Sequence, residues 1–256
     1  MGNSSDVARR THVLLVGVES PGNVGSVARV AKNFGVTRLI LFNPRCEITD
    51  ETYGFAMHAA DVVGKAVVVP EGGTSLERLL SEFDVVVGFT ARAGQYRQIV
   101  RQVVPLPQFE LPPLGPSQRL LLVFGRESRG LTLEELDLLD FLVHVPTSPL
   151  YLSMNLSHAV GVVLYELFSR RAPWVKEGVH VASYRDRQRL YEALREVVVE
   201  SGVRRHKVTN VVRAVKNAWN RAYLTRKECK LILSWLRRTR QILMGRNTGG
   251  RAAPRG

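Results

Sequence analysis

The sequence lacks the features that would place it in several common classes of protein. Among its 256 residues there are only two cysteines, Cys46 and Cys229, and they form no C-x-x-C pair. Neither a structural zinc site nor a disulfide framework is therefore indicated. No apolar run approaches the roughly 18 residues that a membrane-spanning helix needs. The amino-terminal residues MGNSSDVARR contain no hydrophobic signal core, and we expect a cytoplasmic protein.

The signature motifs of several large enzyme classes are missing as well. The dinucleotide fingerprint G-x-G-x-x-G does not occur, and neither does the phosphate-binding loop G-x-x-x-x-G-K-[ST]. The nucleophile elbow G-x-S-x-G and the zinc-binding sequence H-E-x-x-H are also absent. Ser157 and His158 are adjacent on an expected helix and point about 100° apart, which does not suit a nucleophile and its base. These absences disfavour a nucleotide hydrolase, a dehydrogenase, a protease and a metalloenzyme, and we expect no metal.

Acidic residues are scarce in the last third of the chain. Residues 174–256 contain 20 Lys and Arg against 6 Asp and Glu, whereas residues 1–173 contain 16 against 17. The net charge of +13 therefore comes from the last third. A near-neutral part joined to a strongly basic part predicts a polyanion as partner, with nucleic acid before an acidic membrane. A solvated basic surface without a partner is the simpler alternative.

Short apolar runs alternate with helix-period segments over residues 10–170, which predicts an α/β domain. The runs are rich in Val, Leu and Ile at both odd and even positions, which face opposite sides of a strand, as in a parallel sheet covered on both faces. The proline-dense segment 104–117 is expected to be a surface loop. Strands are expected at 12–18, 38–43, 66–69, 84–89, 119–124 and 142–145. Helices are expected at 24–34, at 154–169, and after the capping-box spacings that begin at Thr74 and Thr132.

The basic last third is typical of a small helical module. The segments 183–200, 206–224 and 225–243 each combine an apolar stripe with a side rich in Lys and Arg. Trp219, Tyr223 and Trp235 lie among these cations and could stack on bases, although tryptophans at helical spacing are more often core residues. We divide the chain into a disordered head (1–9), a sheet domain (10–172), a linker (173–183), a basic helical domain (184–245) and a disordered tail (246–256).

Three polar, glycine-bearing segments directly follow expected strands. They are GFTARAG (88–94), FGRESRGL (124–131) and VPTSPLYLSMNLSHA (145–159). Ligands of open α/β sheets bind outside the carboxyl ends of the strands, so we expect these three loops to form one site. Gly88, Gly125 and Gly130 would let the backbone approach a flat ligand closely.

These segments resemble the motifs of one enzyme superfamily. NVGSVAR (23–29), FGRESRGL (124–131) and the segment 146–159, which contains SMNLS, are similar in order and spacing to motifs one, two and three of the SpoU–TrmD (SPOUT) RNA methyltransferases. Within that superfamily, Thr90-Ala91-Arg92 and the basic helical extension are most similar to the TrmJ type. Enzymes of that type methylate the ribose 2′-hydroxyl at position 32 of tRNA.

The resemblance implies a trefoil-knotted α/β methyltransferase domain with S-adenosylmethionine as cofactor. It also implies a homodimer whose active sites use both subunits, and a helical domain that binds tRNA. The implied activity is methylation of a ribose 2′-hydroxyl, with cytidine 32 of the anticodon loop as the target. Methylation of another tRNA or rRNA position, and a non-catalytic RNA-binding protein on the same scaffold, are the alternatives.

The resemblance also assigns roles to individual residues. Arg29 would activate the ribose hydroxyl; because a guanidinium keeps its proton up to a pKa of about 12 or more, we expect it to position the ribose and stabilise the developing alkoxide. Asn23 is expected to hold its loop and to hydrogen-bond Arg29 or the RNA. The other expected catalytic residues are Glu127, Ser153 and Asn155, and the expected cofactor-binding residues are Thr90, Ala91, Arg92, Gly125, Val145, Leu152, Ser153 and Met154.

Simpler structural roles are open to most of these residues. Leu152 and Met154 could be plain core residues. Glu127 could be a carboxylate at a helix start, where the helix dipole favours it. Ser153 and Asn155 could cap the helix that follows them. Arg29 could be an ordinary surface arginine.

Overall fold

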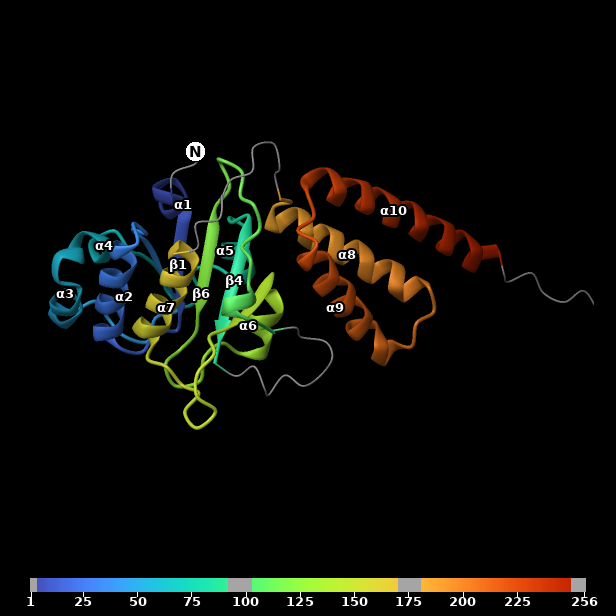
Figure 1. Ribbon diagram of the computed structural model, residues 1–256. Helices are drawn as coiled ribbons and strands as arrows, with labels where there is room; N and C mark the ends of the chain where they lie inside the picture. The colour runs from blue at the N-terminus through green and yellow to red at the C-terminus, as the bar shows by residue number, and fades with distance from the viewer. Residues whose placement is uncertain (1–3, 92–102, 170–180, 250–256) are drawn as a thin grey trace, which may run out of the picture. The chain divides into compact units, whose positions relative to one another are not determined.

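The computed structural model describes residues 4–91, 103–169 and 181–249, which divide into two compact units. Residues 4–91 and 103–169 form the first, which we call the sheet unit because it contains all the described strands. Residues 181–249 form the second, which we call the helical unit. Both units can be followed in Figure 1.

The described strands form one seven-stranded sheet in the order β3-β2-β1-β6-β4-β7-β5. All of its neighbouring strands run parallel. Every residue of β1 and β6 is buried, as expected for a sheet covered on both faces. Each predicted strand is confirmed, with its ends shifted by at most two residues. The strands are β1 (Thr11–Val16), β2 (Arg38–Phe42), β3 (Val67–Val69), β4 (Val85–Thr90), β5 (Val103–Pro105), β6 (Leu120–Phe124) and β7 (Phe141–His144).

The edge strand β5 was not predicted, and it corrects the interpretation of 104–117 as a surface loop. The segment contributes this strand, a short 3-10 helix (Leu106–Gln108) and three buried apolar side chains. Proline excludes a helix interior and a central strand, but it is tolerated on an edge strand such as the one that ends at Pro105. The buried side chains are Leu106, Phe109 and Leu114, all of which belong to the core of the sheet unit.

Helices α2 (Pro21–Asn33) and α7 (Leu156–Ser169) pack against each other, and α3 (Asp50–Ala56) and α4 (Ala60–Gly64) pack against α2 (Figure 1). Helix α2 begins three residues earlier than predicted, because Ser20 is its N-cap and accepts a hydrogen bond from the N–H of Asn23. Asn23 therefore lies in the first turn of the helix. The approach of α3 to α2 requires glycine at position 25, where a Cβ atom would lie 2.1 Å from the carbonyl oxygen of Thr52.

The remaining helices of the sheet unit bring two corrections. Residues 4–9, expected to be a disordered head, belong to α1 (Ser4–Arg10), which buries Val7 and Ala8. Helix α5 (Leu76–Leu80) is capped by Ser75 and not by Thr74. The capping box at Thr132 is confirmed at the start of α6 (Leu133–Leu138).

The helical unit confirms the basic all-helical module. It consists of α8 (Tyr184–Glu200), α9 (Arg205–Arg221) and α10 (Arg226–Gly249), which share one apolar core. Ser183 caps α8 as its sequence suggested. Residues 246–249, expected in a disordered tail, are the last residues of α10.

The α/β fold with a parallel sheet is thus confirmed, and the trefoil knot stays a prediction. Among the described residues, every helix is too short or too polar to cross a lipid bilayer.

We expect the stability of the sheet unit to fall in mild acid because of His12. This side chain lies on β1, edge-on to Phe83 with 4.9 Å between the ring centroids, and is 9% exposed. Burial lowers its pKa from 6.5 to about 4. The unfolded chain therefore binds the extra proton at a higher pH than the folded chain does, and the free energy of unfolding falls as the pH drops from about 6.5 to about 4.

The expected loss is about 1–3 kcal/mol, measured as a lower urea midpoint at about pH 5 than at about pH 7. His12→Gln removes the titrating group and should lose less stability over the same interval. An equal loss in both proteins would show that another group is responsible.

Candidate active site

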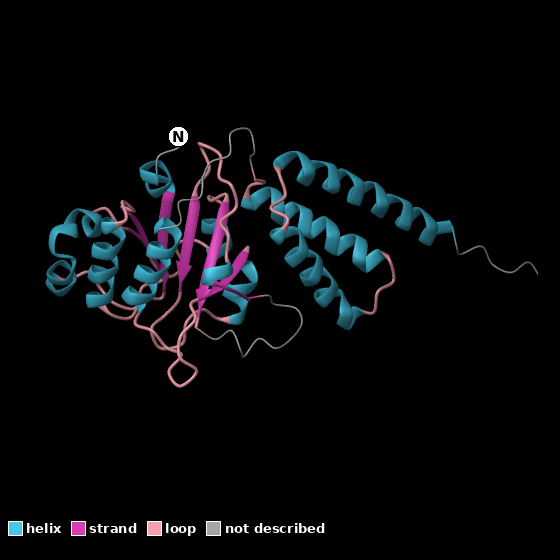
Figure 2. Ribbon diagram, in the orientation of Figure 1, coloured by secondary structure: helices cyan, strands magenta, loops and turns pink. Residues whose placement is uncertain are grey.

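The carboxyl ends of β1, β6, β4 and β7 are neighbours in the sheet. The segments that follow these strands therefore share one edge, and Figure 2 shows loops extending beyond the ends of the central arrows. The three motifs lie in the segments after β1, β6 and β7, and Thr90 and Ala91 lie at the end of β4. The fold thus brings together the loops that the sequence predicted to form one site.

The carboxylate of Glu127 joins the loop after β6 to the start of α2. Oε2 accepts a hydrogen bond from the N–H of Glu19 at 2.9 Å. Oε1 accepts one from the N–H of Ser20 at 3.2 Å and one from Nδ2 of Asn23 at 2.8 Å. The N–H groups at a helix start lack partners within the helix, and the helix dipole favours a negative charge there. Glu127 therefore acts as a carboxylate at a helix start, which is the simpler structural role considered for it above.

Glu19 makes the reciprocal contact. Its carboxylate accepts hydrogen bonds from the N–H of Ser128 at 3.1 Å and from the Ser128 hydroxyl at 2.8 Å. The bond from the hydroxyl lowers the pKa of Glu19. Each of the two loops thus carries a glutamate that binds the backbone of the other loop. Sequence reasoning missed Glu19, and its only signal was an acidic residue directly before a Ser-Pro helix start.

Asn23 connects this pair of loops to the third motif. Nδ2 of Asn155 donates a hydrogen bond to Oδ1 of Asn23 at 2.9 Å. Oδ1 of Asn155 accepts bonds from the N–H and the hydroxyl of Ser157, at 2.9 and 2.7 Å, and so caps α7. Glu127, Asn23 and Asn155 therefore form one continuous hydrogen-bonded chain, which we call the motif bridge. Among the described residues no hydrogen bond joins Asn23 to Arg29, and the expected contact of Asn23 with Arg29 or the RNA stays a prediction.

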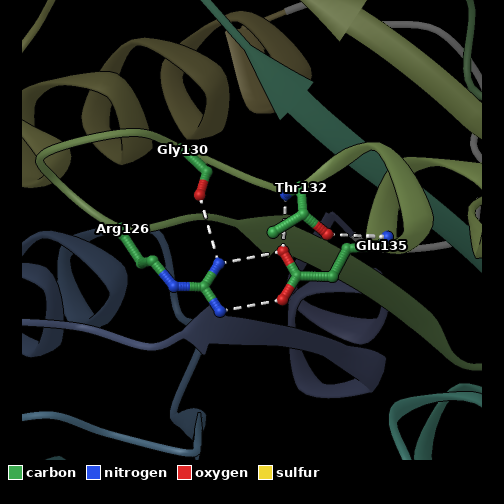
Figure 3. Close-up of polar contacts among 4 residues, drawn as sticks. All are labelled: Arg126, Gly130, Thr132 and Glu135. Atoms are coloured by element: carbon green, nitrogen blue, oxygen red, sulfur yellow. Dashed lines mark hydrogen bonds and ion pairs between the residues drawn. The ribbon is translucent and has the colours of Figure 1, made fainter.

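Arg126 and Glu135 fix the turn of the second motif, as Figure 3 shows. The two terminal nitrogens of Arg126 donate to the two carboxylate oxygens of Glu135, each at 2.9 Å, and one of them also reaches the carbonyl of Gly130 at 3.3 Å. The two side chains are only 10% and 16% exposed. Hydrogen bonds from this bidentate pair raise the pKa of Arg126. Glu135 also accepts a bond from the N–H of Thr132, so one carboxylate fixes both the turn and the helix that follows.

Gly125 is needed for the closure of this same turn. A Cβ atom at that position would lie 2.3 Å from the carbonyl carbon of Gly130 and 2.4 Å from the nitrogen of Leu131. The close approach that the glycine permits is therefore made by the chain itself. Gly125 is thus needed for the turn itself, and its expected approach to a ligand stays a prediction.

Arg29 is exposed on α2, and among the described residues it has neither a hydrogen-bond partner nor an ion-pair partner. It lies one turn beyond Gly25, on the side of α2 that meets α3. It is six residues from Asn23, which places the two side chains about 120° apart around the helix. The motif bridge thus holds the helix start and leaves the guanidinium free for a ligand.

The described residues among the expected cofactor-binding set lie at the ends of β4, β6 and β7 and in the loop after β7. Leu152 is 46% exposed, so plain core packing does not explain it. In the segments that the structure describes, the N–H groups of Leu152, Ser153 and Met154 have no acceptor in the protein. Arg92 lies outside the described residues. Thr90, Val145, Gly125 and Met154 are half-buried, and Ala91 and Ser153 are exposed.

The described part of the chain contains no cluster of three or more His, Cys, Asp or Glu side chains that could hold a metal ion. Both cysteines are free; Cys46 is half-buried and Cys229 is buried. Burial raises the pKa of Cys229 to about 11. This thiol is therefore a packing residue and not a reactive nucleophile.

The sequence matches the model of the SpoU rRNA Methylase family over residues 10–165. It is 33% identical to a tRNA (cytidine-2′-O-)-methyltransferase TrmJ from Methanocaldococcus jannaschii, over 87% of this chain and 96% of the relative. It is 36% identical to a tRNA (cytidine/uridine/adenosine-2′-O-)-methyltransferase TrmJ from Pseudomonas aeruginosa, over 65% of this chain and 62% of the relative. The crystal structure of TrmJ from Z. mobilis superposes with a TM-score of 0.65 at 21% identity, over 88% of this chain and 97% of that one, and supports the fold.

We expect Glu127→Gln to destabilise the sheet unit by about 1–3 kcal/mol. The amide cannot accept from all three donors, and its NH₂ group would face the N–H groups of Glu19 or Ser20. The midpoint of urea unfolding measures the effect. Glu47→Gln, at an exposed glutamate with no hydrogen-bond or ion-pair partner in the described segments, is the matched control. Equal midpoints for the two variants would show that the Glu127 carboxylate does not hold the loops together.

Proposed function

Because this chain belongs to the SpoU rRNA methylase family, we propose that it methylates a ribose 2′-hydroxyl of tRNA, with cytidine 32 of the anticodon loop as the target. The named relatives are tRNA 2′-O-methyltransferases, and the one from M. jannaschii is similar over nearly its whole length. Its name specifies cytidine alone, which favours that base. The observation that carries the proposal is the motif bridge, because it assembles three distant motifs at one sheet edge.

The cofactor is S-adenosylmethionine, the methyl donor implied by the family, and the described residues at the end of β4 and in the loops after β6 and β7 fit it. The free N–H groups of Leu152, Ser153 and Met154 can donate to the acceptor atoms of an adenine ring or a carboxylate. The exposed side chain of Leu152 offers apolar surface to a flat ring. We assign its binding to Thr90, Ala91, Arg92, Gly125, Val145, Leu152, Ser153 and Met154.

S-adenosylmethionine, when bound, would supply an electrophilic methyl group to the ribose 2′-oxygen and would leave as S-adenosylhomocysteine. Arg29 positions the ribose for this transfer. A guanidinium keeps its proton in proteins and is not a base, so the hydroxyl proton leaves to a phosphate or to water. The donors of Arg29 bind the RNA phosphate and the 2′-oxygen as negative charge develops there. Arg29 has no ion-pair partner among the described residues, so no such pair has to break before it binds the RNA.

Glu127, Asn23 and Asn155 act as positioning residues in this proposal. They fix the starts of α2 and α7 against the loop after β6. Helix α2 carries Arg29, and the loop that ends at Asn155 carries the free N–H groups. The bridge would therefore fix the helix that carries Arg29 relative to the loop that would hold the cofactor. Ser153 is exposed beside Asn155 and can contact either ligand.

We also propose that a second copy of the chain completes the site, as the resemblance implies. Val162 and Tyr165 on α7 are 40% and 63% exposed, although Val163 and Leu164 beside them are fully buried. Exposed apolar side chains on a helix that is otherwise packed are typical of an interface.

We expect Arg29→Ala to lower kcat by about 100- to 1000-fold and Arg29→Lys by about 10- to 100-fold, because lysine keeps the charge and loses the planar fork. The assay is methylation of a tRNA transcript, with mass spectrometry of nuclease fragments to locate the methyl group at cytidine 32. Titration calorimetry should show unchanged binding of S-adenosylmethionine.

The matched control is Arg78→Lys, at an exposed arginine on α5. Near-normal turnover of Arg29→Lys would refute the role of the fork, and methylation at another position would refute the target. If the wild-type chain binds tRNA, does not bind S-adenosylmethionine and forms no methylated tRNA, it is the non-catalytic RNA-binding protein.

A further inference from the structure

Helix α10 has an outer face that no other described residue of the helical unit covers. Its inner side buries Cys229 and Leu236, at 1% exposure each, in the core of the helical unit. On its outer side Leu231, Trp235 and Ile242 are 71%, 62% and 49% exposed. Residues three, four, seven and eleven positions apart lie on one side of a helix. We call this face, formed by Lys227, Leu231, Trp235, Arg238 and Ile242, the outer stripe.

The two tryptophans of the helical unit have different surroundings. Trp219 packs against the core and stacks on Tyr191, with 6.5 Å between the ring centroids and an interplanar angle of 16°. Trp235 presents most of its surface to solvent. Core packing therefore explains Trp219 and leaves Trp235 unexplained. A large exposed aromatic side chain with apolar neighbours is typical of a binding surface.

Positive charge is in excess around Trp235. Helix α10 contains seven Lys and Arg but a single acidic residue, Glu228. Two of the cations, Arg226 and Arg240, form ion pairs with Asp186 and Glu196 of α8. The Glu228 carboxylate is held by the N–H and hydroxyl of Thr225, at 2.7 and 2.8 Å. Lys227 and Arg238, within the outer stripe, have no ion-pair partner among the described residues. The stripe thus combines a flat aromatic ring with cations that are free to bind an anion.

We infer that the outer stripe binds an unpaired segment of the RNA substrate, with a base stacked on Trp235 and phosphates on Lys227 and Arg238. Unpaired bases in loops and at ends are the parts of RNA that proteins stack on aromatic rings. The cations complement the phosphate backbone. The inference rests on the proposed function and deepens it, because it places one tRNA contact on the helical unit.

A second copy of the chain and an acidic membrane are the other occupants to consider. Two outer stripes in contact would bring the like charges of Lys227 and Arg238 together, which disfavours self-association. A membrane-bound helix needs a broad apolar face, whereas a cation at Arg238 interrupts this narrow stripe. RNA is the occupant that matches both the ring and the charge.

The test compares Trp235→Ala with Trp235→Phe in the full-length chain, using a tRNA transcript as the probe. Loss of one stacked base should raise the Kd for tRNA about tenfold, and the effect should fall on KM more than on kcat. Trp235→Phe keeps a ring and should bind within about threefold of wild type. Binding of tRNA should quench tryptophan fluorescence less in Trp235→Phe than in wild type.

Val199→Ala, at an apolar residue of α8 that is 52% exposed, is the matched control and should bind tRNA normally. Arg238→Ala should reduce the slope of log Kd against log salt by about 0.7–0.9. Melting temperature and sedimentation coefficient should stay unchanged in Trp235→Ala, because the side chain is exposed.

Three results would overturn the inference. The first is an unchanged Kd for tRNA in Trp235→Ala. The second is a change in oligomeric state, which would make the stripe a contact between copies of the chain. The third is Trp235-dependent binding to phosphatidylserine vesicles without any effect on tRNA. Each leaves the proposed function standing as long as the wild-type chain methylates the transcript; absence of methylation by wild type would instead refute that function.

Discussion

The carboxylate of Glu127 is the contact on which the rest of the candidate site depends. It accepts three hydrogen bonds from the start of α2, and one of its donors, Asn23, in turn accepts from Asn155 at the start of α7. Polar groups at helix starts need partners. Here Glu127 of the second motif satisfies the start of α2, and Asn155 caps α7 while it also donates to Asn23 of the first motif. The same bonds that stabilise the fold therefore also set the geometry of the loops. Residues more than a hundred positions apart in the sequence are thereby held together at one edge of the sheet.

The architecture follows from the sequence where a single physical cause dominates. Continuous Val, Leu and Ile runs predicted the strands of the parallel sheet, and the capping box at Thr132 predicted the start of α6. The edge strand β5 was missed because three residues ending in Pro105 carry no strand pattern. The partners of Glu127, Asn23 and Arg126 were missed because only the tertiary fold brings them into contact. Motif spacing indicated which loops matter, and the structure added what each side chain binds.

The division of charge along the chain matches the division into two units. Residues 1–173, which include the three motifs, hold 16 Lys and Arg against 17 Asp and Glu, and residues 174–256, which include the helical unit, carry the basic excess. The outer stripe of α10 shows that this excess is not a uniformly solvated surface, because an exposed aromatic ring lies within it. In the proposed function, the sheet unit performs the chemistry and the helical unit contributes affinity for the RNA.

A double-mutant cycle between Glu127→Gln and Asn155→Ser tests the motif bridge most directly. Serine at position 155 can still cap α7, so this change removes the bond to Asn23 and keeps the cap. Because both side chains act through Asn23, the double variant should be less destabilised than the sum of the single variants, with a coupling of about 0.5–2 kcal/mol in the free energy of unfolding. Additive effects, within about 0.3 kcal/mol, would contradict the claim that the three motifs are held together as one hydrogen-bonded unit.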